Sequence, residues 1–233
     1  MQQPQIHFIG GEKGGVGKSV VARLLAQYWI DQEKNWKGYD TDRSHGALLR
    51  YYADYSVPVE ISRVEEIDSI METALEEEAN VLVDLAAQTE AQLHQWVEDS
   101  DVLAMADEVG LGMHFWYVLD EGKDSVNLLG NFLARYGNKA RYVIVLNQGR
   151  GDDFSLFHES PVARQVADMQ IPVVELKALH RPTMRKIDQF DKSFWAAVNN
   201  KDPALGECLG IMERQRIKTW LKNAYREFEA IGV

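Results

Sequence analysis

Ten residues near the amino terminus, GGEKGGVGKS at 10–19, combine five glycines with two lysines and a serine. Glycines let a backbone turn sharply and bring its N–H groups close to an anion. Lys18 would add a positive charge there, and the hydroxyl of Ser19 suits Mg²⁺. These residue types at this spacing predict a phosphate-binding loop. Its expected members are Gly14, Gly15, Val16, Gly17, Lys18, Ser19 and Val20.

Three aspartates could supply the carboxylates that a bound Mg²⁺ or an attacking water requires. Asp40 and Asp42 close an expected strand in GYDTDRSHG, and Asp84 follows the apolar run NVLV. Because a parallel sheet gathers its ligands at the carboxyl ends of its strands, we expect Asp84, Asp40 and Ser19 to hold the metal, directly or through water. Asp40 could equally be an acidic partner of the loop, and Asp40 and Asp42 could both be turn residues.

Asn147 ends the apolar segment RYVIVLN and is followed by QGR. Guanine-selective relatives of such loops carry a lysine and an aspartate after this position, and NQGR lacks that pattern. The side-chain amide of Asn147 has both a donor and an acceptor, as the edge of adenine requires. The missing pattern favours adenine over guanine, so we predict that the nucleotide is ATP. An asparagine in a turn before glycine is the alternative.

Strand-like and helix-like segments alternate along the 233 residues, which is typical of βα units that build a parallel sheet. The expected strands are 5–10, a short one ending at residue 40, 57–62, 80–87, 102–106, 113–119, 141–147 and 171–176. The expected helices are 17–33, 46–54, 64–78, 89–100, 124–136, 160–168 and 204–230. This pattern predicts an α/β fold, a doubly wound and mostly parallel sheet flanked by helices. No linker divides the chain, so we expect residues 1–233 to form one domain.

The composition limits the classes of partner. A net charge of −11 argues against an electrostatic grip on nucleic acid by the molecule as a whole. A single cysteine, Cys208, excludes an internal disulfide framework and suits a reducing compartment. No basic stretch followed by a long apolar run lies near the amino terminus, and no segment approaches the ~20 apolar residues of a membrane span. We expect a cytoplasmic protein without stable membrane insertion.

The carboxyl-terminal residues 204–231 have apolar side chains at helical spacing and a basic opposite face. We expect this helix to pack on the domain through its apolar face. The basic face could contact DNA or a protein partner, and a helix that lies on a membrane surface is a further alternative. The basic residues are Arg214, Arg216, Lys218, Lys222 and Arg226.

The stretch KGGVGKS resembles the deviant Walker A loop of the ParA/MinD ATPase superfamily, which has a P-loop NTPase fold. The resemblance implies ATP and Mg²⁺ as cofactors and a homodimer that forms on ATP binding. It also implies that Lys13 reaches the nucleotide of the partner subunit, that Lys18 contacts the phosphates, and that Asp42, in switch I, positions the hydrolytic water. The side-chain amide of Asn147 would, by the same resemblance, hydrogen-bond adenine. Lys13, Lys18 and Asp42 are therefore the expected catalytic residues, with Asp84 near the metal.

Within this superfamily the chain looks like the TraL-type conjugal-transfer ATPases and the related mobilisation and plasmid-stability proteins. The segments GVGKSVVARLLAQYWIDQ, DTD and IMERQRIK carry that resemblance. It implies slow ATP hydrolysis in plasmid transfer, mobilisation or maintenance, together with other conjugation or maintenance proteins. The alternatives are a ParA/MinD-like positioning ATPase, a nucleotide-binding scaffold with little hydrolysis, and a small-metabolite synthetase of the same fold.

Three residues near the expected site depart from the superfamily pattern. Glu12 occupies the position of the first glycine, and Arg43 and Ala87 stand where proline is usual. Two unit charges about 5 Å apart repel by roughly 3 kcal/mol at an effective dielectric near 20, so a Glu12 carboxylate that faced the phosphates would weaken binding by about a hundredfold. We therefore expect the Glu12 side chain to point outward, to solvent or across the dimer interface.

Overall fold

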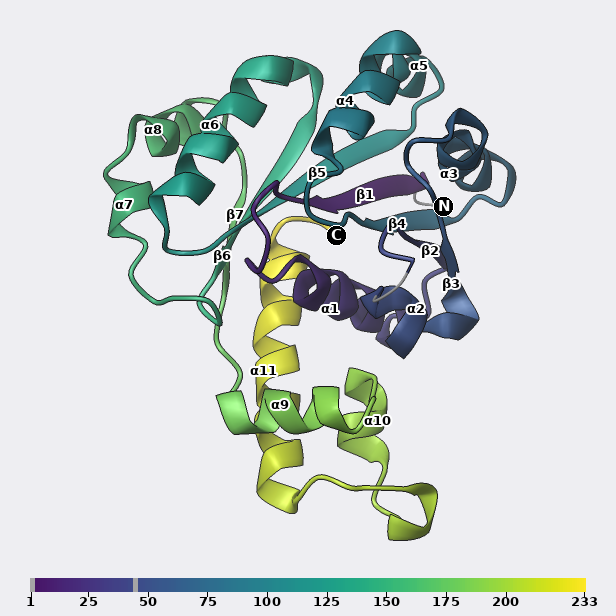
Figure 1. The fold of residues 1–233 in the computed structure, drawn as a ribbon, viewed down its shortest axis with the longest axis vertical. Coiled ribbons are helices and arrows are strands. Elements are labelled where there is room, and N and C mark those ends of the chain that lie inside the picture. The colour runs from purple at the N-terminus through teal and green to yellow at the C-terminus, as the bar shows by residue number, and fades with distance from the viewer. Residues whose placement is uncertain (1–2, 44–45) are drawn as a thin grey trace.

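The centre of the molecule is a sheet of seven parallel strands (Figure 1), seen in a computed structural model that describes residues 3–43 and 46–233. The strands lie in the order β3-β2-β4-β1-β5-β6-β7 across the sheet. They are β1 (Gln5–Gly10), β2 (Trp36–Asp40), β3 (Ser56–Pro58), β4 (Asn80–Asp84), β5 (Gly112–Leu119), β6 (Arg141–Asn147) and β7 (Val173–Leu176). The expected α/β class with a doubly wound parallel sheet is confirmed.

Helices cover both faces of the sheet and enclose a separate apolar core on each (Figure 1). The first face carries α3 (Val64–Glu76), α4 (Glu90–Asp99), α5 (Val102–Glu108), α6 (Lys123–Tyr136), α7 (Ser155–His158) and α8 (Pro161–Asp168). The second carries α1 (Lys18–Asp31), α2 (Ala47–Tyr51), α9 (Arg181–Gln189), α10 (Phe194–Asn199) and α11 (Ile211–Ala230). Side chains of a strand alternate between the two cores, so Phe8 packs in the first and Ile9 in the second.

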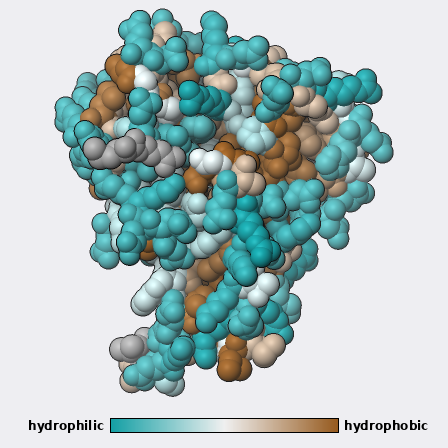
Figure 2. All heavy atoms as spheres, turned by 180° about the vertical axis from the view of Figure 1, so that it is seen from behind, coloured by the Kyte–Doolittle hydropathy of each residue, from teal (hydrophilic) through white to brown (hydrophobic). Residues whose placement is uncertain are grey.

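A lower lobe, residues 181–210, extends beyond the sheet, and α11 runs from this lobe back to the sheet (Figure 1). Ile217, Leu221 and Phe228 are buried on the face of α11 that contacts the second core. Large apolar side chains also stay exposed in this part of the molecule, and Figure 2 shows apolar surface near its tip. They include Trp195, Ile211 and Met212.

The register of the central strands determines where the expected site forms. Asp40 of β2 pairs with Asp84 of β4, and Asp84 in turn pairs with Ile9 of β1, one residue before Gly10. The phosphate loop starts directly after β1, so three neighbouring strands bring the loop and both carboxylates to the same carboxyl edge of the sheet.

Residues 102–106 form part of helix α5, and the expected strand there was wrong. Val102 and Ala106 are buried four residues apart, which puts both on one side of a helix against the first core. A short apolar run fits a buried strand and a buried helix equally well when only its composition is known.

Three smaller differences concern the ends and number of elements. Strand β3 covers Ser56–Pro58 and not 57–62, and α11 begins at Ile211, after a 3₁₀ turn at Pro203–Leu205, and not at residue 204. Pro58 has no N–H for the strand ladder, which limits pairing beyond it. The short helices α7 and α10 were not expected.

Candidate functional site

The expected phosphate loop runs from the end of β1 into α1, which begins at Lys18. Gly15 and Gly17 have φ angles of 82° and 100°, a left-handed conformation that favours glycine. The buried ammonium of Lys18 donates to the carbonyl oxygens of Gly11 at 2.8 Å and Lys13 at 3.1 Å. Burial lowers the pKa of Lys18, so an anion beside it would stabilise the charged form.

The loop borders a pocket of about 240 Å³ at the carboxyl edge of the sheet. The pocket is lined by Gly14, Gly15, Gly17, Lys18, Ser19, Val20, Asp40, Asp42, Gly46, Ala47, Asp84, Leu85, Ala86, Ala87 and Arg150. The structure thus brings the three expected aspartates together with the loop. Val16, Asn147 and Lys13 do not line this pocket, and Val16 is buried beneath the loop.

Asn147 lies directly against the loop. Its Nδ2 donates to the carbonyl oxygen of Val16 at 2.7 Å, and its Oδ1 accepts from the N–H of Gly149 at 3.1 Å. A Cβ at Gly17 would lie 2.2 Å from Nδ2 of Asn147, so glycine is required there by this close approach as well as by its φ. The amide braces the loop from behind, and its contact with adenine stays a prediction.

Asp84 is the most unusual carboxylate of the site. It is buried, and its Oδ1 has no hydrogen-bond partner among the residues that the structure describes. Burial and the charge of Asp40 raise the pKa of Asp84 to about 7, although a hydrogen bond from Ser19 and the charge of Lys18 oppose the rise. A cation beside this oxygen would stabilise the ionised carboxylate.

The oxygen ligands at this point fit Mg²⁺. Within residues 3–43 and 46–233 no group of three or more His, Cys, Asp or Glu side chains could hold a metal alone. Mg²⁺ commonly takes one or two protein oxygens and completes its shell with water and substrate phosphates. The hydroxyl of Ser19 and the free Oδ1 of Asp84 match that requirement, and both line the pocket beside the loop.

Asp40 fixes the backbone that follows β2. Its Oδ1 accepts from the N–H of Asp42 at 3.0 Å, and its Oδ2 accepts from the N–H of Leu48 at 2.9 Å, in the first turn of α2. A Cβ at Gly46 would lie 2.4 Å from that Oδ2, so the carboxylate needs a glycine there. Burial raises the pKa of Asp40 and the backbone hydrogen bonds oppose the rise. With these bonds in place, Asp40 could reach a metal through water.

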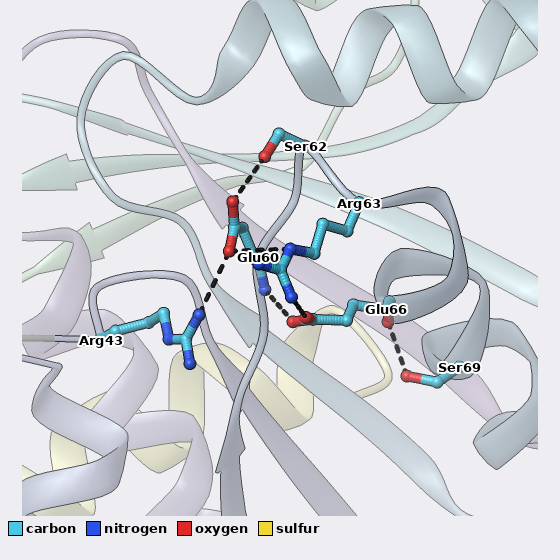
Figure 3. Close-up of polar contacts among 6 residues, drawn as sticks. All are labelled: Arg43, Glu60, Ser62, Arg63, Glu66 and Ser69. Carbon is cyan, nitrogen blue, oxygen red and sulfur yellow. Dashed lines mark hydrogen bonds and ion pairs between the residues drawn. The ribbon is translucent and has the colours of Figure 1, made fainter.

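Arg43 follows Asp42 and forms an exposed ion pair. Asp42 lines the pocket, whereas the guanidinium of Arg43 forms an ion pair with Glu60 at 3.2 Å (Figure 3). Glu60 also accepts from Ser62 and Arg63. The Arg43–Glu60 pair therefore links the residues after β2 to the segment that precedes α3.

Lys13 forms an ion pair with Asp120, which follows β5, at 2.8 Å between Nζ and Oδ2. The carboxylate of Asp120 also accepts from the hydroxyl of Ser125 and from the N–H of Gly122. Burial acts to raise the pKa of Asp120, but the hydrogen bonds from Lys13 and Ser125 outweigh it and hold the pKa below its usual value. A Cβ at Gly122 would lie 2.7 Å from the Lys13 ammonium. Lys13 is thus paired within its own chain.

Glu12 points away from the phosphate pocket. Its side chain is exposed and lines a different hollow, shared with Glu90 and His94 of α4. The expectation of an outward orientation is confirmed for this protomer.

Arg150 is a site residue that the sequence did not single out. It lies in the turn after β6, where its N–H donates to the carbonyl oxygen of Asn147 at 2.9 Å, and it lines the same pocket as the aspartates. The sequence signal that could have identified Arg150 is a basic residue three positions after the asparagine that ends a strand. The guanidinium adds a second positive charge to the wall of the pocket that Lys18 borders.

The chain has a MinD-like P-loop fold. The MinD cell division protein of Aquifex aeolicus has a TM-score of 0.56 to this chain at 14% identity, and the match covers 97% of each chain. The MinC:MinD cell division protein complex of Aquifex aeolicus matches with a TM-score of 0.54, also at 14% identity. Chloroplast FtsY from Physcomitrella patens matches at 0.51 and 19% identity, over 74% of this chain and 58% of its own.

The chain is a distant full-length homologue of TraL. Two proteins named Protein TraL, both from Escherichia coli, are 24% identical to it over 241 and 246 residues. Each match covers 98% of this chain and 99% of the TraL protein. No protein-family model matches the chain. Among the described helices, none combines the length and the apolar character that crossing a membrane requires.

Proposed function

We propose that this protein is a Mg²⁺-dependent ATPase that hydrolyses ATP slowly as a homodimer and acts in plasmid conjugal transfer, mobilisation or maintenance. The observation that carries the proposal is the buried Oδ1 of Asp84, which lacks a hydrogen-bond partner within the described residues and lies beside the phosphate loop. A Mg²⁺ ion that is bound to a polyphosphate would stabilise the ionised form of this carboxylate. The N–H groups of the loop and the ammonium of Lys18 suit the phosphates. The full-length similarity to TraL supports the biological setting.

Nucleotide binding would change the partners of Lys18. Its ammonium now donates to two loop carbonyls, and a phosphate oxygen is the stronger acceptor because it is charged. Ser19 and Asp84 would hold Mg²⁺, which supplies charge neutralisation and orientation of the terminal phosphate when bound. Asn147 would contact adenine by exchanging its bond with the Gly149 N–H for one to the base.

Hydrolysis would depend on Asp42. Phosphoryl transfer requires a water held in line with the leaving group, and the enzyme contributes positioning more than covalent chemistry. Asp42 lines the same pocket as the loop, and the carboxylate of Asp40 accepts from the Asp42 N–H. The water-orienting carboxylate thus comes from a segment whose position depends on Asp40 and on the Arg43 ion pair.

The homodimer would form around two apposed nucleotides. Their phosphates repel each other, and a lysine from each subunit would offset that repulsion. Lys13 suits this role because Lys18 already serves the nucleotide of its own subunit. In the protomer, Lys13 is held by Asp120, so dimer formation would exchange this ion pair for a contact with the partner's nucleotide.

The setting that we propose is the cytoplasm, with other conjugation or plasmid-maintenance proteins as partners. The MinD structures that share this fold include a complex with MinC, which is consistent with a fold that can present a surface to another protein. A ParA/MinD-like positioning ATPase is the alternative with the same chemistry. DNA contact through the basic face of α11 stays a prediction.

Competition binding tests the core of the proposal. Calorimetry with Mg-ATP and Mg-GTP would be done on the wild type, on Asp84→Asn and on a control, Asp54→Asn, whose side chain is exposed away from the pocket. We expect ATP to bind at least about tenfold more tightly than GTP, and Mg²⁺ to strengthen ATP binding in the wild type and the control only. Equal GTP affinity would refute the adenine assignment, and a protein that binds neither nucleotide would refute the ATPase.

A further inference from the structure

The charges of this protein are unevenly distributed. Residues 177–226 contain 11 of the 25 lysines and arginines but only 5 of the 36 aspartates and glutamates, so this segment has a net charge of +6 and the rest of the chain −17. The segment forms the lower lobe and most of α11 (Figure 1). An acidic protein thus carries one basic region, far along the chain from the phosphate loop.

A groove of about 470 Å³ lies in this region between α10 and α11. Its apolar surface comes from Val198 and Leu221 over the buried ring of Phe194. Trp195 stands at one side with 57% of its surface exposed. A tryptophan this exposed beside an apolar floor is typical of a residue that anchors a partner side chain.

Three cations border the same groove on α11. Lys218, Lys222 and Arg226 follow one another at intervals of four residues, which places them on one helix face about 6 Å apart in rise. The part of the chain that the structure describes gives none of the three an ion pair, although four other basic side chains of the lobe and its surroundings have one. The groove therefore combines an apolar floor with a row of three cations that form no ion pair among the described residues.

The wall of the groove is rigidly attached to the rest of the molecule. The N–H of Trp195 donates to Oε1 of Gln27, in the helix that begins at the phosphate loop, at 2.9 Å. Arg23 of the same helix is buried and pairs with Asp188 of α9 at 2.7 Å. These bonds hold α10 and α9 against α1, so the groove exists before a partner arrives.

We propose that this groove binds an acidic peptide segment of a partner protein, with a large apolar side chain against Trp195 and carboxylates against Lys218, Lys222 and Arg226. Charge complementarity identifies the occupant. A peptide fits better than a nucleic acid because the floor of the groove is apolar, and because a short peptide carries fewer negative charges than a nucleic-acid strand and so meets less repulsion from Asp31, Glu229 and the −17 remainder.

The test uses the nucleotide-free full chain, so its outcome does not depend on ATP binding. The probe is a fluorescein-labelled helical peptide with leucine and phenylalanine along one face and glutamate on the other, measured by fluorescence anisotropy. We expect Lys222→Glu and Trp195→Ala each to weaken binding by about tenfold. The control Lys139→Glu, at an exposed lysine outside the groove, should change binding by less than about twofold.

Three results would overturn the proposal. The first is that the glutamate peptide shows no measurable binding. The second is that a matched peptide with lysine in place of glutamate binds equally well. The third is that oligothymidine displaces the glutamate peptide from the wild type but not from Lys222→Glu. The last result would assign the groove to single-stranded nucleic acid. Trp195 and Lys222 are both exposed, and circular dichroism of each variant would establish that it is folded.

Discussion

Lys13 and Asp120 pair within one protomer, with 2.8 Å between Nζ and Oδ2. The pair joins the phosphate loop to the end of β5, and the same lysine is the one that we propose for the partner's nucleotide. It must leave Asp120 before it can act there. The two side chains are 32% and 18% exposed, so solvent screening limits the pair to about 1 kcal/mol or less. A nucleotide in the partner subunit could therefore displace it.

Weakening this pair should favour the dimer. In Asp120→Asn the amide keeps the shape of the side chain but attracts Lys13 less, so we expect ATP-dependent dimerisation at about three- to fivefold lower protein concentration. Sedimentation velocity across a dilution series measures this. Asp124→Asn, an exposed acid in the first turn of α6, is the matched control and should behave as the wild type. Unchanged or weaker dimerisation of Asp120→Asn would mean that the pair does not restrain Lys13.

Replacing Asp42 should separate hydrolysis from binding. Asp42→Ala removes the carboxylate that we propose for orienting the water, so we expect the turnover number to fall by about tenfold or more while ATP affinity changes by less than about threefold. Phosphate release and calorimetry measure the two quantities. Asp54→Ala serves as the control, and an Asp42→Ala protein with normal turnover would contradict the assignment.

Replacing Glu12 should leave ATP affinity nearly unchanged. The carboxylate is exposed and lies outside the phosphate pocket, so Glu12→Gly removes no charge that faces the nucleotide. We expect the dissociation constant for Mg-ATP to stay within about twofold of the wild type. A gain in affinity near a hundredfold would show that Glu12 turns toward the phosphates when the nucleotide binds.

The register of the strands explains which parts of the site the sequence could predict. Glycines and a lysine between a strand and a helix identify the phosphate loop locally, and Asp40 and Asp84 each end an expected strand, so their common edge follows from a parallel sheet. The partner of Lys13 could not be predicted this way. Asp120 reaches Lys13 because β5 lies next to β1, and the order of strands in a sheet has no local signature.

Two stacked histidines should make stability depend on pH. His7 and His114 lie with their ring centroids 4.8 Å apart, and Trp116 donates to Nδ1 of His7 at 2.9 Å. Burial, with His114 and then Lys34 adding to it, lowers the pKa of His7 well below its usual value. Burial, aided by the charge of Arg141, lowers the pKa of His114 to about 4.

The sign of the effect follows from proton binding. Between pH 6.5 and the lowered pKa values the unfolded chain binds more protons than the folded one, so the free energy of unfolding falls as the pH falls through this range. His114 should account for about 2 kcal/mol of loss between pH 6.5 and pH 5. Urea unfolding of the wild type and His114→Gln at both pH values measures it, and their difference cancels the titration of carboxylates such as Asp84. The control His158→Gln, at an exposed histidine, should show the same change in the free energy of unfolding between the two pH values as the wild type. If His114→Gln also shows the wild-type change, the account is wrong.

The central claim is an ATP-dependent dimer in which Lys13 acts across the interface. Sedimentation velocity of the Asp42→Ala protein, in which hydrolysis should be too slow to reverse assembly, tests it most directly. The account predicts a dimer with Mg-ATP, a monomer with Mg-ADP, and a monomer with Mg-ATP when Lys13→Ala is added. A monomer under all three conditions, or a dimer that forms equally well without Lys13, would contradict it.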